Sequence, residues 1–181
     1  MTIYLIRHGA TAANEQRLYC GSTDLPLSPA GRAALAGLSY DIKNARFLTS
    51  GRKRANETLA LLFGDVNFCV EPRFCEMDFG SFEMKSYEQL RTDPLYQRWL
   101  TGDNEQNPTP GGESGAQMKR RALAAFFALR EDSVVITHGG VIAAIMQELF
   151  PQEHKNRYDW QPAPGHGYRL ESLPHWHYRA L

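Results

Sequence analysis

The chain has 181 residues, of which 43% are hydrophobic and 22% charged, a composition typical of one globular domain with a buried core. Lys plus Arg and Asp plus Glu both number 20, so the formal net charge is zero, which argues against a nucleic-acid partner. Cys20, Cys69 and Cys75 form no C-x-x-C pair, which argues against a disulfide framework or a zinc site. No apolar run is long enough to span a bilayer and no leader pattern opens the chain. We therefore expect a single cytoplasmic domain over residues 1–181, with no membrane partner.

The N-terminal half alternates apolar runs with helical patterns. Residues 2–6 are rich in β-branched and aromatic side chains without polar alternation, which predicts a strand buried on both faces. Ser28-Pro29 supplies an N-cap followed by proline at the first helical position, and predicts a helix through Leu38. A strand at 45–49, a helix at 54–63 and a weaker strand at 66–70 are predicted next.

The C-terminal half begins with a helical pattern over residues 87–100 that Pro94 breaks into two pieces. The following segment, 101–115, is rich in Pro, Gly, Asn and charge, which predicts a mobile surface loop. Together these residues form an expected lid segment of about 84–115. A helix at 117–129, a strand at 133–137, a helix at 140–150 and a last strand at 168–173 are predicted next.

This alternation predicts an α/β fold, a three-layer α/β/α sandwich with a mostly parallel central sheet. Ligands of such folds bind outside the carboxyl ends of the strands. Residues that directly follow the strands are therefore the first candidates for a site. No G-x-G-x-x-G follows the first strand, which excludes a dinucleotide-binding fold.

Two predicted strand ends carry a histidine followed by glycine. His8 follows Arg7 after the first strand, and His138 follows the strand at 133–137. A third strand end leads into a helix that begins near Arg54. A single histidine at a turn is usually an ordinary polar residue, but several converging cations would repel one another without an anion. Because guanidinium groups bind phosphate oxygens bidentately, the pattern predicts a phosphate site.

Several motifs, in order from residue 3 to about residue 146, resemble the histidine phosphatase superfamily, which includes the cofactor-dependent phosphoglycerate mutases. Each motif alone is weak, and it is their shared order that indicates the family. The motifs are Leu5-Ile6-Arg7-His8-Gly9-Ala10-Thr11 with Asn14, Gly21-Ser22-Thr23-Asp24-Leu25-Pro26-Leu27-Ser28 with Gly31, Thr49-Ser50 with Arg54-Ala55 and Thr58, Glu76-Met77-Asp78-Phe79-Gly80 with Phe82-Glu83, Pro110-Gly111-Gly112-Glu113-Ser114, and Thr137-His138-Gly139-Gly140-Val141-Ile142. The resemblance implies a phosphoglycerate mutase-like fold.

The resemblance also implies a metal-independent phosphatase that passes through a phosphohistidine. His8 would attack phosphorus, which requires a neutral ring with its other nitrogen held as a donor. Arg7, Arg54 and His138 would bind the phosphoryl oxygens, and Glu76 would be the general acid and later the base that activates water. Further substrate contacts are expected at Asn14, Ser22, Thr23 and Gly139. No metal ligand set and no cofactor are predicted.

The substrate is predicted less closely than the chemistry. The segment from Glu76 to Tyr87 looks most like the α-ribazole phosphate phosphatases of cobalamin synthesis, whereas Pro110-Gly111-Gly112-Glu113-Ser114 is shared with broad-specificity relatives. The mutases are generally longer, and a thin lid favours hydrolysis because water reaches the phosphohistidine. We therefore expect a phosphomonoester hydrolase acting on a small phosphorylated metabolite such as α-ribazole 5′-phosphate. Phosphoglycerate mutase and broad-specificity phosphatase are the alternatives.

Some features have two interpretations. Cys20 is either a reactive thiol at the mouth of the site or a buried, inert one. The tail at 174–177 contains His-x-His, which would suit a metal on a strand, yet no companion ligand is evident, and an aromatic cluster is favoured. Four aromatic residues of the lid region either face a planar organic group or form the core of the lid: Phe82, Tyr87, Tyr96 and Trp99.

Overall fold

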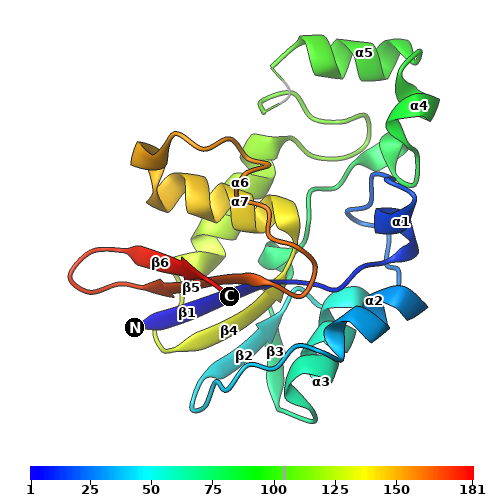
Figure 1. The fold of residues 1–181 in the computed structure, drawn as a ribbon. Helices are drawn as coiled ribbons and strands as arrows, with labels where there is room; N and C mark the ends of the chain where they lie inside the picture. Colours follow the sequence, from blue (N-terminus) through cyan, green and yellow to red (C-terminus); the bar gives the residue numbers. More distant parts are fainter. Residues whose placement is uncertain (104) are drawn as a thin grey trace.

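The computed structural model describes residues 1–103 and 105–181. Six strands form one sheet in the order β3-β2-β4-β1-β5-β6 (Figure 1). The first four strands of that order are parallel, whereas β5 is antiparallel to both of its neighbours. The predicted mostly parallel sheet is therefore confirmed. The strands are β1 (Thr2–Arg7), β2 (Arg46–Thr49), β3 (Phe68–Val70), β4 (Ser133–Thr137), β5 (Gly167–Glu171) and β6 (His177–Ala180).

Helices cover both faces of this sheet, with α6 and α7 on one side and α2 and α3 on the other (Figure 1). The three-layer prediction is thus confirmed. The helices are α1 (Ala12–Glu15), α2 (Pro29–Leu35), α3 (Lys53–Phe63), α4 (Tyr87–Leu90), α5 (Pro94–Thr101), α6 (Gly115–Phe126) and α7 (Gly139–Leu149), with 3-10 turns η1 (Pro72–Phe74), η2 (Gly80–Phe82) and η3 (Pro151–Glu153). No helix of residues 1–103 and 105–181 is long and apolar enough to cross a membrane.

The central strand β4 explains why the sheet needs two helical layers. All five of its residues are buried, and successive side chains of a strand point to opposite faces. Val135 joins the core beneath α6 and α7, whereas Val134 and Ile136 join the core beneath α3. A strand that is apolar on both faces cannot be left exposed on either one.

Short elements account for most differences from the predicted boundaries. Helix α1 was not predicted, because its four residues form a single turn capped by Thr11. Helix α6 begins at Gly115 rather than 117, since Ser114 caps it and forms a capping box with Gln117. Strand β6 was also missed, because it lies within an aromatic tail. Pro94 opens α5 as its first residue, which confirms the predicted break.

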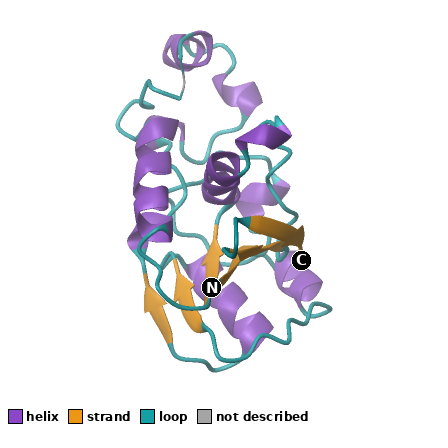
Figure 2. Ribbon diagram, turned by 90° about the vertical axis from the view of Figure 1, so that its left-hand side faces the viewer, coloured by secondary structure: helices purple, strands orange, loops and turns teal. Residues whose placement is uncertain are grey.

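Helices α4 and α5 lie at the end of the molecule farthest from the strands (Figures 1 and 2). They enclose a small core of their own, made of Phe82, Leu90 and Tyr96. The segment 101–115, predicted as a mobile surface loop, is partly buried at its C-terminal end; residue 104 lies outside the described residues. Thr109 and Ser114 are buried, and the Pro110 carbonyl accepts a hydrogen bond from the Ser81 N–H at 2.8 Å. The end of this loop is packed because it pairs with the segment that follows Glu76.

Candidate active site

The site lies at the carboxyl edge of the parallel strands. Strands β2, β4 and β1 are adjacent in the sheet and run parallel. The residues that follow them therefore lie close together at the same edge. His8 follows β1, His138 follows β4 and Ser50 follows β2. The His8 N–H donates to the Thr137 carbonyl at 2.9 Å, and the two imidazole centroids are 5.0 Å apart in an edge-on arrangement. The structure thus brings together the two histidines predicted from separate strand ends.

His8 is held in the form that a nucleophile requires. Its side chain is buried, and its Nδ1 lies 2.6 Å from the Gly9 carbonyl oxygen. Because a carbonyl oxygen only accepts, Nδ1 carries the proton and Nε2 keeps its lone pair. Burial, reinforced by the charges of Arg54 and Arg7, lowers the pKa of His8 to about 3. The ring is therefore neutral at any ordinary pH.

Arg54 is a buried cation, with an exposed fraction of 1%. Its Nη1 donates to the Thr23 carbonyl at 2.8 Å and its Nη2 to the Gly21 carbonyl at 2.7 Å. Its Nε donates to Nδ1 of His138 at 3.4 Å. In the described chain its partners are thus neutral oxygens and a ring nitrogen, so the positive charge stays uncompensated at the site.

His138 is fully buried between two polar partners. Its Nδ1 accepts from Arg54, so the proton of the neutral ring belongs on Nε2, which lies 2.8 Å from the Ser50 hydroxyl. Burial lowers the pKa of His138 well below its usual value, and the neighbouring His8 and Arg54 lower it further. Ser50, at the end of β2, therefore fixes the orientation of this ring.

Arg7 lies against the start of α7. Its Nη1 donates to the Pro162 carbonyl at 2.9 Å, and its buried Nε has no partner among the described residues. Burial lowers the pKa of this guanidinium, although the charge of Glu76 opposes the shift. A Cβ at Gly139 would lie 3.4 Å from the Arg7 Cζ and 2.8 Å from the Gln161 side-chain oxygen. Glycine at 139 therefore leaves room for the Gln161 side chain beside Arg7.

Glu76 is also bound to the start of α7. Its Oε2 accepts from the Gly140 N–H and its Oε1 from the Met77 N–H, both at 2.9 Å. A Cβ at Gly140 would stand only 2.3 Å from Oε1, so a side chain at this position would displace the carboxylate from its present place. Gly140 follows His138 by two residues, and this places Glu76 beside the cationic cluster.

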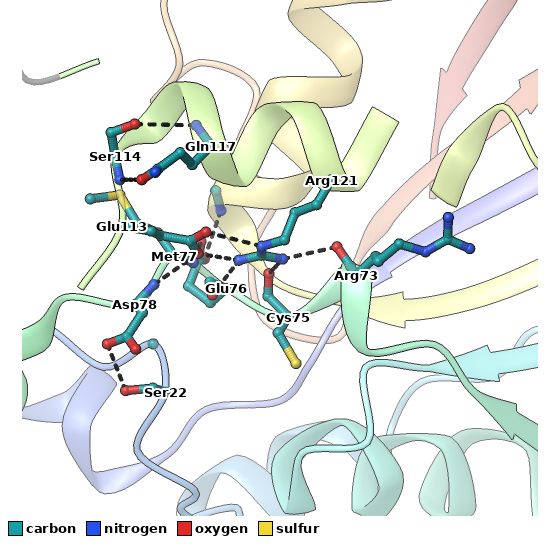
Figure 3. A network of polar contacts seen from close by, with 12 residues as sticks. Ser22, Arg73, Cys75, Glu76, Met77, Asp78, Glu113, Ser114, Gln117 and Arg121 are labelled. Atoms are coloured by element: carbon teal, nitrogen blue, oxygen red, sulfur yellow. Dashed lines mark hydrogen bonds and ion pairs between the residues drawn. The ribbon is translucent and has the colours of Figure 1, made fainter. Parts of the chain in front are cut away.

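Ser22 and Thr23 use their hydroxyls to hold a loop. The Ser22 Oγ donates to Asp78 at 2.9 Å, as Figure 3 shows, and the Thr23 Oγ1 donates to Glu83 at 2.7 Å. The Glu83 carboxylate also accepts the backbone N–H groups of residues 21, 22, 23 and 79. The structure therefore places these two side chains in the frame that presents the Gly21 and Thr23 carbonyls to Arg54.

Asn14 has a structural contact too. Its Oδ1 accepts from the N–H and the hydroxyl of Thr11, both at 2.9 Å, and so caps α1. This bond turns the side-chain oxygen of Asn14 toward its own helix turn.

The sequence did not single out Gln161, Pro162 or Arg121. The first two belong to an irregular segment between α7 and β5, for which sequence patterns give no signal. Arg121 had one: it lies on α6 among buried residues, one position before Ala122 and three after Met118, and a cation on an apolar stripe needs buried partners.

The structure bears on the tail at 174–177 and on Cys20, the features that had two interpretations. Among residues 1–103 and 105–181, no cluster of His, Cys, Asp or Glu could hold a metal ion. In the tail, the Trp176 ring packs at a tilt against Phe126, with the ring centroids 5.3 Å apart, as the aromatic interpretation predicted. Burial raises the pKa of the half-buried Cys20 thiol, which opposes thiolate reactivity.

A cleft of about 240 Å³ opens beside Glu76. Glu76, Gly140 and Gln161 line it together with the side chains of four aromatic residues, Tyr19, Phe79, Trp99 and Tyr158. Of the aromatic residues predicted to face a planar group, Trp99 alone is among these, because Phe82 and Tyr96 are in the lid core and Tyr87 is 54% exposed.

The chain belongs to the histidine phosphatase superfamily (branch 1), which it matches over residues 3–174. Members of this superfamily are phosphatases and mutases. It is 30% identical to the adenosylcobalamin/alpha-ribazole phosphatase of Escherichia coli (strain K12) over 164 residues, covering 82% of this chain and 79% of that one. It is 28% identical over 165 residues to the protein named "Probable phosphoglycerate mutase GpmB" of Salmonella paratyphi B, covering 82% and 74%.

Solved structures agree with this fold. An Escherichia coli K-12 protein proposed to be an alpha-ribazole-5′-P phosphatase superimposes with a TM-score of 0.85 at 25% identity, covering 100% of this chain and 95% of that one. A phosphoglycerate mutase from Thermus thermophilus gives a TM-score of 0.78 at 29% identity, covering 100% and 96%. The predicted phosphoglycerate mutase-like fold and family are confirmed.

Burial of neutral His8 makes the protein less stable in acid. The unfolded histidine has a pKa near 6.5, so between pH 6.5 and 3 the unfolded state binds a proton that the native state does not. Stability therefore falls as pH falls below about 6.5, by an amount on the order of 2 kcal/mol at pH 5 for this residue alone. Urea titrations at pH 8 and pH 5 should show a smaller loss in His8→Asn than in the wild type. The exposed His175→Asn variant is the control, and an equal loss in all three proteins would contradict this origin.

Proposed function

We propose that this protein is a phosphomonoester hydrolase that forms a phosphohistidine on His8. The observation that carries the proposal is the buried neutral ring, with Nδ1 donating to Gly9 and Nε2 unprotonated, beside the uncompensated charge of Arg54. A neutral nucleophile next to fixed cations is suited to attack on an anionic phosphoryl group.

The first step transfers the phosphoryl group to the protein. The Nε2 lone pair of His8 forms a bond to phosphorus while the ester P–O bond breaks. Arg7 and Arg54 balance the charge on the phosphoryl oxygens, and His138, Asn14 and the Gly139 N–H are proposed to bind these oxygens as neutral donors. Protonated Glu76 gives its proton to the departing alkoxide, which leaves as an alcohol.

The second step hydrolyses the phosphohistidine. Glu76, now a carboxylate, takes a proton from water as the water oxygen attacks phosphorus, and the N–P bond breaks to restore neutral His8. The proposed mechanism uses neither a metal ion nor a cofactor, because the guanidinium groups of Arg7 and Arg54 supply the positive charge that a metal would supply elsewhere. We also propose that residues 1–181 form a single domain in which about residues 84–115 make a thin lid.

The substrate is proposed to be a small metabolite whose alcohol carries a planar organic group. The four aromatic side chains of the cleft beside Glu76 suit such a group, because aromatic faces stack with one another. α-Ribazole 5′-phosphate has this chemistry, and two of the similar proteins carry alpha-ribazole phosphatase names. Ser22 and Thr23 are proposed to act on the substrate through the loop that orients Arg54.

Phosphoglycerate mutase is the second candidate, and the similarity to the Thermus structure favours it. A glycerate carboxylate needs a free cation next to the phosphate. Among the described residues that line the cleft, Arg157 is the one cation, and it forms an ion pair with Glu105 at 2.7 Å. The composition of this cleft therefore suits an aromatic leaving group better than a carboxylate.

A substrate screen in the presence of EDTA tests the proposed function. We expect release of inorganic phosphate from α-ribazole 5′-phosphate with a higher kcat/KM than from 3-phosphoglycerate, and no loss of rate on chelation. Conversion of 3-phosphoglycerate to 2-phosphoglycerate faster than hydrolysis would identify a mutase instead. Activity that EDTA removes and zinc or magnesium restores would show that the histidines had been misinterpreted.

Replacing His8 removes the nucleophile. The His8→Ala variant should lose turnover by at least about 10³-fold, because no other group is placed to attack, while Arg54 still binds phosphate. In the wild type, mass spectrometry after an alkaline quench should locate the phosphoryl group on His8. His175→Ala is the matched control and should remain fully active. A phosphoryl group on any other residue would contradict the mechanism.

Replacing Glu76 should affect substrates according to their leaving groups. The Glu76→Gln variant keeps the size of the side chain but has no proton to donate. A general acid contributes about 10²–10⁴-fold, so kcat/KM for ribose 5-phosphate, which reports formation of the phosphohistidine and not its hydrolysis, should fall by that order. The kcat/KM for p-nitrophenyl phosphate should change little, because nitrophenolate leaves without a proton. The exposed Glu88→Gln is the control. Equal losses on both substrates would exclude Glu76 as the acid and direct the same test to Asp78.

A further inference from the structure

Glu76 lies in a stretch of irregular backbone between the 3-10 turns η1 and η2. No sheet or helix ladder fixes residues 75–79. Their peptide groups therefore need other partners, since buried backbone groups are almost always hydrogen-bonded.

Arg121, on helix α6, is the hydrogen-bond partner of two of these carbonyls and of a third just before them. Its Nη1 donates to the carbonyls of Arg73 at 2.9 Å and Cys75 at 2.5 Å, and its Nη2 donates to the carbonyl of Glu76 itself at 2.9 Å (Figure 3). One planar guanidinium thus contacts the backbone at three points along four residues. Lysine has no such fork and could not reproduce this pattern.

Glu113 completes the arrangement on the other side of Glu76. Its carboxylate accepts from Nε of Arg121 at 3.1 Å and also from Nη2. The same carboxylate accepts the Asp78 N–H at 3.1 Å, and the Glu113 N–H donates to the Asp78 carbonyl at 3.0 Å. The pair Arg121–Glu113 therefore binds the chain before, at and after Glu76.

The Arg121–Glu113 pair is shielded enough from solvent to fix the position of the backbone around Glu76. The side chains of Arg121 and Glu113 are 24% and 19% exposed, so their contacts are weakened less by solvent than those of a surface ion pair. The contacts also reach the carboxylate, because one of its donors is the N–H of Met77, whose direction is set by the same stretch of backbone.

We propose that Arg121, together with Glu113, is a positioning residue that sets the reach of the Glu76 carboxylate toward the leaving group. The inference rests on the proposed role of Glu76 as general acid. Arg121 binds carbonyl oxygens and Glu113 in this structure, so it acts through Glu76 rather than on the phosphoryl group.

The test compares two substrates in five proteins: wild type, Arg121→Met, Arg120→Met, Glu76→Gln and the double variant Glu76→Gln/Arg121→Met. Methionine keeps the apolar stem and removes every donor. Arg120 is the matched control, because it is the adjacent residue of α6 and is exposed. kcat and KM are measured for ribose 5-phosphate and for p-nitrophenyl phosphate, together with Tm for each variant.

A misplacement of about 1 Å in a catalytic group can cost about 10²-fold in rate. We therefore expect Arg121→Met to lower kcat/KM, which reports formation of the phosphohistidine, by about 10–10²-fold for ribose 5-phosphate and by less than about threefold for p-nitrophenyl phosphate. Arg120→Met should behave as wild type. The double variant should match Glu76→Gln on ribose 5-phosphate, since Arg121 has no acid left to position.

A loss of equal size on both substrates would show a merely structural role and overturn the inference. If Arg121→Met does not fold, Glu113→Gln replaces it, because the amide oxygen can still accept the Asp78 N–H while the charge that holds Arg121 is lost. Leaving-group discrimination in Glu76→Gln without any in Arg121→Met or Glu113→Gln overturns the positioning role alone. Absence of discrimination in Glu76→Gln overturns the role of Glu76 and this inference together.

Discussion

The site depends on a buried cation that has no buried counter-ion among the described residues. Arg54 is satisfied by the carbonyls of Gly21 and Thr23 and by the ring of His138. A carboxylate partner would stabilise the guanidinium more strongly, but it would also cancel the field that an anionic substrate feels. Because dipoles satisfy the hydrogen bonds without neutralising the charge, the field of Arg54 adds to the effect of burial in lowering the pKa of His8 and keeps its ring neutral.

Two carboxylates, those of Glu83 and Glu113, do not contact Arg54 but bind the segments around it. Glu83 accepts the N–H groups of the loop that presents the two carbonyls to Arg54, whereas Glu113 binds Arg121 and the backbone beside Glu76. Glu83 and Glu113 thus accept hydrogen bonds from backbone and from Arg121, and neither forms an ion pair with Arg54 or Arg7 among the described residues. Glu76 is the carboxylate among these three that lies at the start of α7.

Strand patterns and motifs in the sequence were enough to predict the sheet and part of the site. The positions of His8 and His138 follow from apolar runs that end abruptly, since the edge of a parallel sheet gathers whatever comes next. Glu76 is different, because nothing in its local pattern separates it from other acidic residues, and only the family resemblance pointed to it. The contacts of Arg121 could not be predicted, as they depend on how an irregular segment packs on a helix more than forty residues away.

The strand order also governs when His8 can reach its place during synthesis. Strand β1 is made first, yet its two neighbours in the sheet are β4 and β5, which begin at Ser133 and Gly167. Until those residues leave the ribosome, an apolar strand remains without a partner, and such strands are prone to associate with other chains. Pairing of strands so far apart in the sequence also slows folding. The chain loses the entropy of loop closure before the strand contacts that offset this loss have formed. A nascent chain of this protein therefore depends on its last third to become both soluble and reactive.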